Sequence, residues 1–412
     1  MNLKESVNVF EGKTLSDIYI NQIRNVMHNG ESCAPRGLKI KELQPAITII
    51  HNSVPILPLL FCPGRNWNPF FAIAELIWVL AGDEKTEWIC KFNKSLIKFS
   101  NDKKKFDGAY GHRIRNHFIG SEAFVSAPVD QLKEVYDKLF YDKDTRQAVM
   151  VLWDAYRDNL KGSYDYPCND MVMFKVRDNK LNMTVCNRSN DLILGLPYNV
   201  CVFGGIQRVL ASMLGVNIGR QIHYSDSLHI YESEFERANM IIKRFVNFPF
   251  TTTALRNDSF FEYKNGFANG GLSVKNLEEL DFITLAIKCG DICDLLINKK
   301  YDVWANFYKF LNSYLYFVKR EYNECLKRFL FVGDDILFLN GAQYYLRVAN
   351  ERKGKKKKKH GASSVSVIDA FMASIRNEIK NRFIKQGEDY WDVVKYNYML
   401  AFVEGENYDR IC

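Results

Sequence analysis

The 412-residue chain lacks any apolar run that approaches the roughly 20 residues needed to cross a bilayer. Its first residues, MNLKESVNVFEGKTL, contain no apolar signal core. We therefore expect no membrane insertion and a cytoplasmic location. The ten cysteines lack the density of a disulfide framework, so reduced thiols are expected. The spacing CGDIC, which ends in Cys293, has no histidine or second pair nearby, and this argues against a metal site.

Hydrophobic residues make up 47% of the chain and aromatic residues 14%, which suffices for a substantial core in two or three domain-sized units. The net charge is +8, and most of it can be traced to two lysine runs, NDKKKF and GKKKKKHG. Such runs are typical of solvated loops, and the second predicts a linker over 351–362. Because no aromatic residues are interleaved with these lysines, direct binding of nucleic acid is not expected.

Strand and helix patterns are mixed along the first 260 residues. PAITIIHNSV and TRQAVMVLWDAY, the second led by Arg146, predict strands. MVMFKVRD and KLNMTVCNRS predict two strands joined by a turn at RDNK, and CVFGGIQRVLASMLGV predicts a core helix. From about residue 275 the patterns are helical and rich in aromatic residues. We predict an α+β fold, with one domain over 1–260 and a mainly helical extension over 261–412.

One charged residue interrupts an apolar helix. NPFFAIAELIWVLAGDE predicts a helix capped by Asn68, with Pro69 in its first turn and Gly82 at its end. Glu75 lies in the middle of this run, where an ionised carboxylate is costly unless it is paired. A surface glutamate that reaches solvent would be the simpler interpretation. We predict a buried acid with a raised pKa, because its apolar neighbours leave little room for a polar face.

Three further segments carry candidate chemistry. In DYPCND, Cys168 is either a small buried filler or a nucleophile. In CNRSNDLILGLPYNVCVF, Arg188 and Ser189 would make a phosphate clamp and Asn199 can both donate and accept, although a capped turn would also explain this loop. In SLHIY, His229 and Tyr231 would share one face of a strand, as a structural pair also would.

The motifs AELIWVLAGD, GAYGHRI, DTRQAV, YPCN, CNRSNDLILGLPYNV and SLHIY occur in the order and spacing of the thymidylate synthase family. The chain resembles this family over roughly residues 15–245, and in particular its branch of deoxypyrimidine nucleotide hydroxymethylases. The resemblance implies a mixed β-sheet packed with helices and a homodimer. It also implies 5,10-methylenetetrahydrofolate as cosubstrate, without a metal.

The resemblance assigns a role to each matching residue. It implies catalysis by Cys168 as nucleophile, by Glu75 as general acid and base, and by Tyr110. It implies that the nucleotide monophosphate is bound by Arg36, Arg188 and Ser189 at the phosphate, by Arg146 from the partner subunit, by Asn199 at the base, and by His229 and Tyr231 at the deoxyribose hydroxyl. It implies that Asp191 and Gly195 contact the folate and the base.

Several departures from the synthase pattern decide between two products. The segment before AYG lacks tryptophan, and the chain ends EGENYDRIC rather than in an apolar tail. Ser227 stands where an aspartate is usual, and Gln147 where a second arginine is usual. A wall without tryptophan admits water more easily, so we predict a 5-hydroxymethyl product, as a precursor of a modified DNA base. Asn169 replaces the common histidine after the nucleophile, and the effect of this change is open.

The base is predicted from Asn199, whose amide can donate to O4 of uracil and accept from N3–H, whereas aspartate would suit cytosine better. This favours dUMP as substrate. The alternatives are thymidylate synthase, a dCMP hydroxymethylase, and a nucleotide-binding homologue without turnover.

Overall fold

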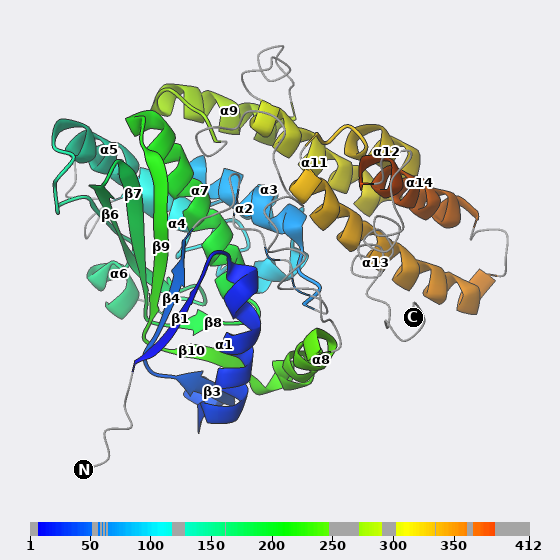
Figure 1. Ribbon diagram of the computed structural model, residues 1–412, viewed down its shortest axis with the longest axis horizontal. Helices are drawn as coiled ribbons and strands as arrows, with labels where there is room; N and C mark the ends of the chain where they lie inside the picture. The colour runs from blue at the N-terminus through cyan, green and yellow to red at the C-terminus, as the bar shows by residue number, and fades with distance from the viewer. Residues whose placement is uncertain are drawn as a thin grey trace. The chain divides into compact units, whose positions relative to one another are not determined.

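A mixed six-stranded sheet and a smaller four-stranded sheet form the centre of the N-terminal part of the chain (Figure 1). The computed structural model describes residues 7–51, 57, 60, 62, 65–117, 128–160, 162–246, 272–290, 302–333, 335–360 and 366–383. The described residues divide into two compact units, one within 1–62 and 72–289 and the other within 63–71 and 290–412. The predicted boundary at 260/261 lies outside the described residues.

The larger sheet has the strand order β1-β4-β9-β7-β6-β5. Its strands are β1 (Asn8–Gly12), β4 (Ala46–Ile50), β5 (Val149–Val151), β6 (Asn169–Arg177), β7 (Lys180–Asn187) and β9 (Asn217–Ser225). The predicted pair β6 and β7 is confirmed as an antiparallel hairpin. Asp178 and Asn179 turn the chain with φ of 51° and 55°, which suits the two left-handed positions of a tight hairpin turn.

The smaller sheet has the order β2-β3-β10-β8. Its strands are β2 (Glu31–Cys33), β3 (Ile40–Leu43), β8 (Asn190–Asp191) and β10 (Leu228–Tyr231). β10 pairs antiparallel with β3 and parallel with β8. The sheet therefore brings together segments of the chain that are far apart in sequence.

Helices cover the sheets. α7 (Leu196–Leu214) runs along β7 and β9, and its residues from Val200 to Ala211 are buried (Figure 1). α1 (Leu15–Asn29) packs on β1, β3 and β10, and α5 (Gln131–Tyr141) packs on β5 and β6. The short helices of the same unit are α3 (Thr86–Ile89), α4 (Tyr110–Arg115) and α6 (Ala155–Leu160), and the longer α8 (Phe235–Val246) and α9 (Leu277–Cys289) follow. The predicted α+β class is confirmed.

The predicted apolar helix is α2 (Pro69–Leu80). Asn68 caps it as expected, because its Oδ1 accepts from the amides of Phe70 (3.1 Å) and Phe71 (3.2 Å). Gly82 follows the helix with φ of 66°, in the left-handed region that favours glycine.

The second unit contains α11 (Asp302–Lys319), α12 (Tyr322–Phe329), α13 (Asp335–His360) and α14 (Ser366–Phe383). Its core is aromatic: Phe70 stacks on Phe310 with 4.0 Å between ring centroids, and Phe317 lies 4.5 Å from Tyr345. The expected helical C-terminal region is therefore confirmed, with aromatic residues in its core.

Two local expectations differ from the structure. The lysine run expected as a linker over 351–362 continues α13 as far as His360, because lysine is a good helix former and the run extends a helix that is already packed. The strand expected to begin at Arg146 begins at Val149, and Arg146 lies in the exposed segment before it. The buried residues Ala148, Met150 and Leu152 mark where packing against α5 begins.

A close helix contact sets the position of α4. A Cβ on Gly111 would lie 2.8 Å from both Cα and the carbonyl oxygen of Val79 in α2. These are backbone atoms, so α4 would have to shift. Only a residue without a side chain allows this contact.

We expect Gly111→Ala to destabilise the protein by about 1–3 kcal/mol, because overpacking against a backbone outweighs the gain in helix propensity. The measurement is the urea unfolding midpoint. Gly162→Ala is the matched control, since its Cβ would meet nothing within 4 Å, and its midpoint should not change. Equal midpoints for the two variants would contradict the contact.

Candidate active site

Cys168 and Tyr110 are joined through the backbone. Cys168 immediately precedes β6, and Tyr110 is the first residue of α4. The Tyr110 hydroxyl oxygen accepts hydrogen bonds from the amides of Cys168 (3.1 Å) and Asn169 (3.3 Å). The hydroxyl oxygen thus accepts two hydrogen bonds, and the hydroxyl proton can be donated to a third partner.

The thiol of Cys168 is held mainly in its neutral form. Burial raises its pKa, and Asp165 and Asp191 act in the same direction. Arg188 and Arg36 oppose them. The nearby cations therefore favour the thiolate, but desolvation is the larger effect.

Arg188 is fixed beside Cys168 by three contacts. Its Nε donates to the carbonyl oxygen of Pro167 (2.9 Å), and its backbone amide donates to the carbonyl oxygen of Cys168 (3.1 Å). Its guanidinium lies 5.3 Å from the ring centroid of Trp153, and that ring stacks on Tyr166. Trp153 was not identified from the sequence, because it lies 35 positions before Arg188 and no motif links the two residues.

A tight turn between β8 and α7 carries the next group. Oδ1 of Asp191 accepts from the amides of Ile193 and Leu194, both at 2.8 Å. Gly195 is the N-cap of α7, and its carbonyl accepts from the amide of Asn199 (3.0 Å). Asn199 therefore lies in the first turn of α7. Ser189 lies between Arg188 and β8.

His229 and Tyr231 lie on one face of β10, as predicted for an extended segment. Their ring centroids are 5.0 Å apart at an interplanar angle of 89°. Burial raises the pKa of Tyr231, with smaller contributions from Asp191 and Cys168, while Arg36 opposes the shift. These electrostatic effects show that β10, the turn before α7, the nucleophile segment and Arg36 meet at one place.

Glu75 has the raised pKa predicted for it. Burial raises its pKa to about 8. Its Oε2 is buried and has no hydrogen-bond partner among the described residues, although the side chain as a whole keeps some exposure. Cys201 of α7 lies close enough to interact with it electrostatically. Glu75 is therefore protonated at neutral pH and can donate a proton.

The two remaining predicted arginines differ in their contacts with this group. Arg36 is exposed and has φ of 54°, next to Gly37 with φ of 78°. It interacts electrostatically with Cys168 and Tyr231. Arg146 is exposed, and no hydrogen bond or ion pair joins it to the other predicted residues within the described part of the chain.

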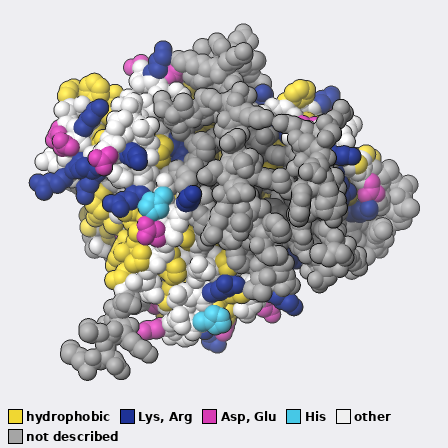
Figure 2. Space-filling view, viewed as in Figure 1, with side chains coloured by type: hydrophobic (Ala, Val, Ile, Leu, Met, Phe, Trp, Pro, Cys, Tyr) yellow, Lys and Arg dark blue, Asp and Glu magenta, His cyan; other side chains and the backbone are white. Residues whose placement is uncertain are grey.

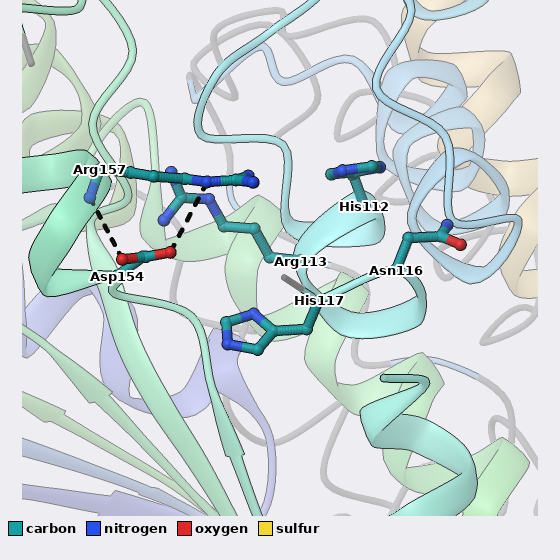
Figure 3. Close-up of a pocket in the computed structure, with 6 residues that line it drawn as sticks. All are labelled: His112, Arg113, Asn116, His117, Asp154 and Arg157. Carbon is teal, nitrogen blue, oxygen red and sulfur yellow. Dashed lines mark hydrogen bonds and ion pairs between the residues drawn. The ribbon is translucent and has the colours of Figure 1, made fainter. Parts of the chain in front are cut away.

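A separate small pocket lies at the end of α4 (Figure 3). It is lined by His112, Arg113, Asn116, His117, Asp154 and Arg157. None of the residues predicted from the sequence lines it. One of the lining residues, Arg113, donates to both carboxylate oxygens of Asp158 and to the carbonyls of Asp107 and Leu152. This buried pair anchors α4 to α6, and so helps to hold Tyr110.

Comparison with known proteins identifies similar chains. The family model described as thymidylate synthase matches residues 17–283, well over half of the chain. The chain is 40% identical over 230 residues to a deoxyuridylate hydroxymethyltransferase of Bacillus phage SP01, and 36% identical over 180 residues to another of Pseudomonas phage M6. It is 35% identical over 234 residues to a putative thymidylate synthase of Methanothermobacter marburgensis.

These matches cover different shares of each protein. They span 55%, 43% and 56% of this chain, respectively. The chain covers 59% and 49% of the length of the two phage proteins, and 95% of the archaeal protein. The sequence motifs indicated the hydroxymethylase branch of the family. This prediction is confirmed, because both phage relatives are named deoxyuridylate hydroxymethyltransferase.

The raised pKa of Glu75 predicts a pH-dependent stability. Between the ordinary pKa of 4.5 and the folded value of about 8, the unfolded state loses this proton and the folded state keeps it. Stability therefore falls as pH rises through this window, by about 1.4 kcal/mol per pH unit from this group alone. Glu75→Gln removes this contribution. The difference in free energy of unfolding between variant and wild type should widen from pH 5 to pH 8 and stay constant above.

Urea unfolding at several pH values measures this difference. Glu134→Gln, on the exposed side of α5, is the control, and its curve should run parallel to that of the wild type. Parallel curves for Glu75→Gln as well would contradict the raised pKa.

Proposed function

Because this chain belongs to the thymidylate synthase family, we propose that it transfers a one-carbon group to C5 of dUMP and adds water, which forms 5-hydroxymethyl-dUMP. The observation that carries the proposal is the convergence of Cys168, Tyr110, Arg188 and Tyr231 around one point, with Glu75 protonated on α2. Two relatives named deoxyuridylate hydroxymethyltransferase support the choice of product. The product would serve as a precursor of a modified DNA base, made in the cytoplasm.

Cys168 would act as the nucleophile. C5 of a pyrimidine becomes nucleophilic when a thiolate adds at C6, and the same sulfur can leave at the end of the reaction. Because burial keeps the free thiol protonated, its proton has to leave as the C6–S bond forms. Arg188 and Arg36 stabilise the negative charge during this step.

Glu75 and Tyr110 would manage protons around the base. Glu75, with its pKa of about 8, donates a proton to the base as negative charge develops there, directly or through water, and accepts one when C5 loses its proton. Tyr110 holds the Cys168 segment in place, because its hydroxyl oxygen accepts hydrogen bonds from two backbone amides of that segment. Its remaining hydroxyl proton can stabilise the sulfur or a neighbouring water.

The turn before α7 fits a folate. Asp191 is partly exposed, and the side chain of Leu194 is 48% exposed beside it. This combination offers a carboxylate to ring N–H groups and apolar surface to the ring itself. When bound, 5,10-methylenetetrahydrofolate supplies the one-carbon unit. Asp191 and Gly195 would hold it next to Asn199, which would bind the uracil edge.

Two features support water as the final acceptor of the one-carbon unit. The side chain of Asn169 is fully buried, and neither its oxygen nor its nitrogen has a partner among the described residues. A buried amide of this kind holds water or a ligand. In the segment before Gly108, which contains no tryptophan, Phe99 ends the 3₁₀ helix Lys94–Phe99 and is 42% exposed. Water reaching the exocyclic carbon then forms the C–O bond, and the C6–S bond breaks to release Cys168.

The second candidate is thymidylate synthase itself. It is favoured by the archaeal relative of that description, 95% of whose length is covered. The two reactions differ only in whether hydride or water reaches the exocyclic carbon.

We expect incubation with dUMP and methylenetetrahydrofolate to give a product heavier than dUMP by one hydroxymethyl substitution, together with tetrahydrofolate. Mass spectrometry and absorbance of the folate measure both products. Cys168→Ala should give neither product nor the covalent complex with 5-fluoro-dUMP and folate. Formation of thymidylate and dihydrofolate would contradict the proposed hydroxymethyl product. A covalent complex formed by the Cys168→Ala variant would contradict the assignment of Cys168 as the nucleophile.

The same assay tests the base. We expect dUMP to be preferred over dCMP, and Asn199→Asp to shift the preference towards dCMP by about tenfold or more, because the amide no longer donates to O4. Preference of the wild type for dCMP would contradict the assignment of Asn199.

A homodimer would complete the phosphate site. The face of the larger sheet opposite α7 carries apolar side chains that keep partial or full exposure: Ile47, Ile49, Val149, Val151, Met171, Met173 and Ile222. Apolar side chains are exposed in the part of the surface that the strands occupy (Figure 2). An apolar sheet face of this kind suits a second copy of the chain. Arg146, exposed at the start of β5, would then reach the partner's phosphate site.

Met173→Lys places a charge on this face, opposite Val149, and should give monomers in sedimentation or light scattering. Met240→Lys is the matched control: it makes the same change on α8 at a side chain that is 45% exposed, and should leave the dimer intact. A dimeric Met173→Lys variant would contradict the interface.

Arg146 is tested by mixing subunits. Arg146→Ala and Cys168→Ala chains should each be inactive alone. Refolded together they should regain activity, because one site of the mixed dimer then contains both residues. No recovery would show that Arg146 does not act across the interface.

A further inference from the structure

Ser227 and His229 lie on one face of the chain at β10, two residues apart. His229 is 4% exposed. In the motif this segment resembles, an aspartate precedes the histidine by two residues, and here that place is taken by Ser227. A serine cannot supply the negative charge that an aspartate would bring to the imidazole.

A carboxylate reaches the same place from the neighbouring strand. His229 of β10 is the register partner of Glu42 in β3, and side chains of such partners lie on the same face. The Ser227 hydroxyl donates to Oε2 of Glu42. The distance between Ser227 Oγ and Nδ1 of His229 is 3.4 Å. The three side chains thus form a chain from the carboxylate to the imidazole.

The direction of these hydrogen bonds follows from the number of protons. Serine has one hydroxyl proton, and this proton is committed to Glu42. The Ser227 oxygen can then only accept from His229, so Nδ1 carries the imidazole proton. In a neutral imidazole Nε2 is then an acceptor. The 3′-hydroxyl is the one free hydroxyl on the sugar of dUMP, and it is a donor that suits Nε2.

The carboxylate of Glu42 is itself held in position. Its Oε1 accepts from the side-chain amide of Gln44 and from the thiol of Cys33 (3.1 Å). Three donors, Cys33 in β2, Gln44 directly after β3 and Ser227 directly before β10, therefore fix both oxygens of one carboxylate. Such an arrangement orients the Ser227 hydroxyl without the help of a ligand.

We propose that Glu42 is a positioning residue, which acts through Ser227 to hold His229 with its proton on Nδ1 and with Nε2 as the acceptor for the 3′-hydroxyl of the nucleotide. This inference rests on the proposed function for the identity of the ligand. Glu42 thereby takes the role of the aspartate that this chain lacks, from a position 185 residues before Ser227 in the sequence.

The test is a set of four variants in the full chain: Glu42→Gln, Ser227→Ala, Ser227→Asp, and Ser227→Asp combined with Glu42→Gln. The first two should raise KM for dUMP about tenfold with little change in kcat, because a charge-assisted hydrogen bond is weakened. KM for the analogue without a 3′-hydroxyl, 2′,3′-dideoxyuridine 5′-monophosphate, should not change. A purely structural role would raise KM for both nucleotides.

The double variant gives the sharpest outcome. Ser227→Asp alone places two carboxylates side by side and should impair binding. In the Glu42→Gln background the same aspartate has no competing charge, and it should restore KM for dUMP towards the wild-type value. Glu31→Gln is the matched control, since Glu31 is the register partner of Glu42 in β2, and it should behave like the wild type. Absence of this rescue would overturn the proposal.

A second measurement does not depend on activity. Nitrogen-15 NMR of histidine-labelled protein should show His229 with its proton on Nδ1 in the wild type, and a mixture of tautomers in Glu42→Gln. A proton on Nε2 in the wild type would overturn the relay. If the Nδ1 tautomer is present but dUMP is neither bound nor converted, the proposed function fails and the relay stands.

Discussion

Two amide hydrogen bonds to the Tyr110 hydroxyl are the constraint on which the candidate active site depends. They join the segment of Cys168, at the start of β6, to the first residue of α4. α4 is in turn fixed against α2 by the contact of Gly111 with the backbone of Val79. Because α2 carries Glu75, one continuous set of contacts positions both Glu75 and Cys168. A shift of α4 would therefore disturb both groups.

Burial has the same consequence for the two reactive groups of this set. It raises the pKa of Glu75 to about 8 and raises the pKa of Cys168 above its ordinary value. Both groups are therefore neutral in the free protein at neutral pH. The two arginines near Cys168 do not overcome its desolvation, and a bound phosphate would take up part of their charge. If Cys168 is the nucleophile, as proposed, its thiolate would form during the reaction and not before the nucleotide binds.

Local sequence signals predicted local structure well. The turn RDNK, the cap of α2 by Asn68 and the raised pKa of Glu75 depend on neighbouring residues or on the apolar character of one helix. The lysine run was predicted wrongly as a loop, because its charge was given more weight than the helix propensity of lysine and the packed helix it continues. The strand led by Arg146 was predicted to begin three residues too early and to run past Val151, where β5 ends, because nothing in the sequence marks where packing on α5 begins and ends.

Contacts between distant segments could not be predicted in this way. Nothing near Arg188 indicates that Trp153 lies beneath its guanidinium, and nothing near Ser227 indicates Glu42. Each of these contacts depends on strand pairing or on a loop position that only the fold determines. Ser227 stands where the family motif usually has an aspartate, and strand pairing places the carboxylate of Glu42 beside it, at the register position of His229.

Asn169 connects these arguments to the chemistry. Asn169 directly follows Cys168 in the sequence, and its side-chain amide is fully buried. Its backbone N–H donates one of the two hydrogen bonds that the Tyr110 hydroxyl oxygen accepts. The histidine usual at this place can change its charge with pH, whereas an asparagine keeps one donor group and one acceptor group at every pH. A water bound by this amide would therefore have the same orientation whatever the ionisation of Glu75 and Cys168. The replacement removes a titrating group and leaves a fixed polar one, and this supports the proposal that water reaches the exocyclic carbon.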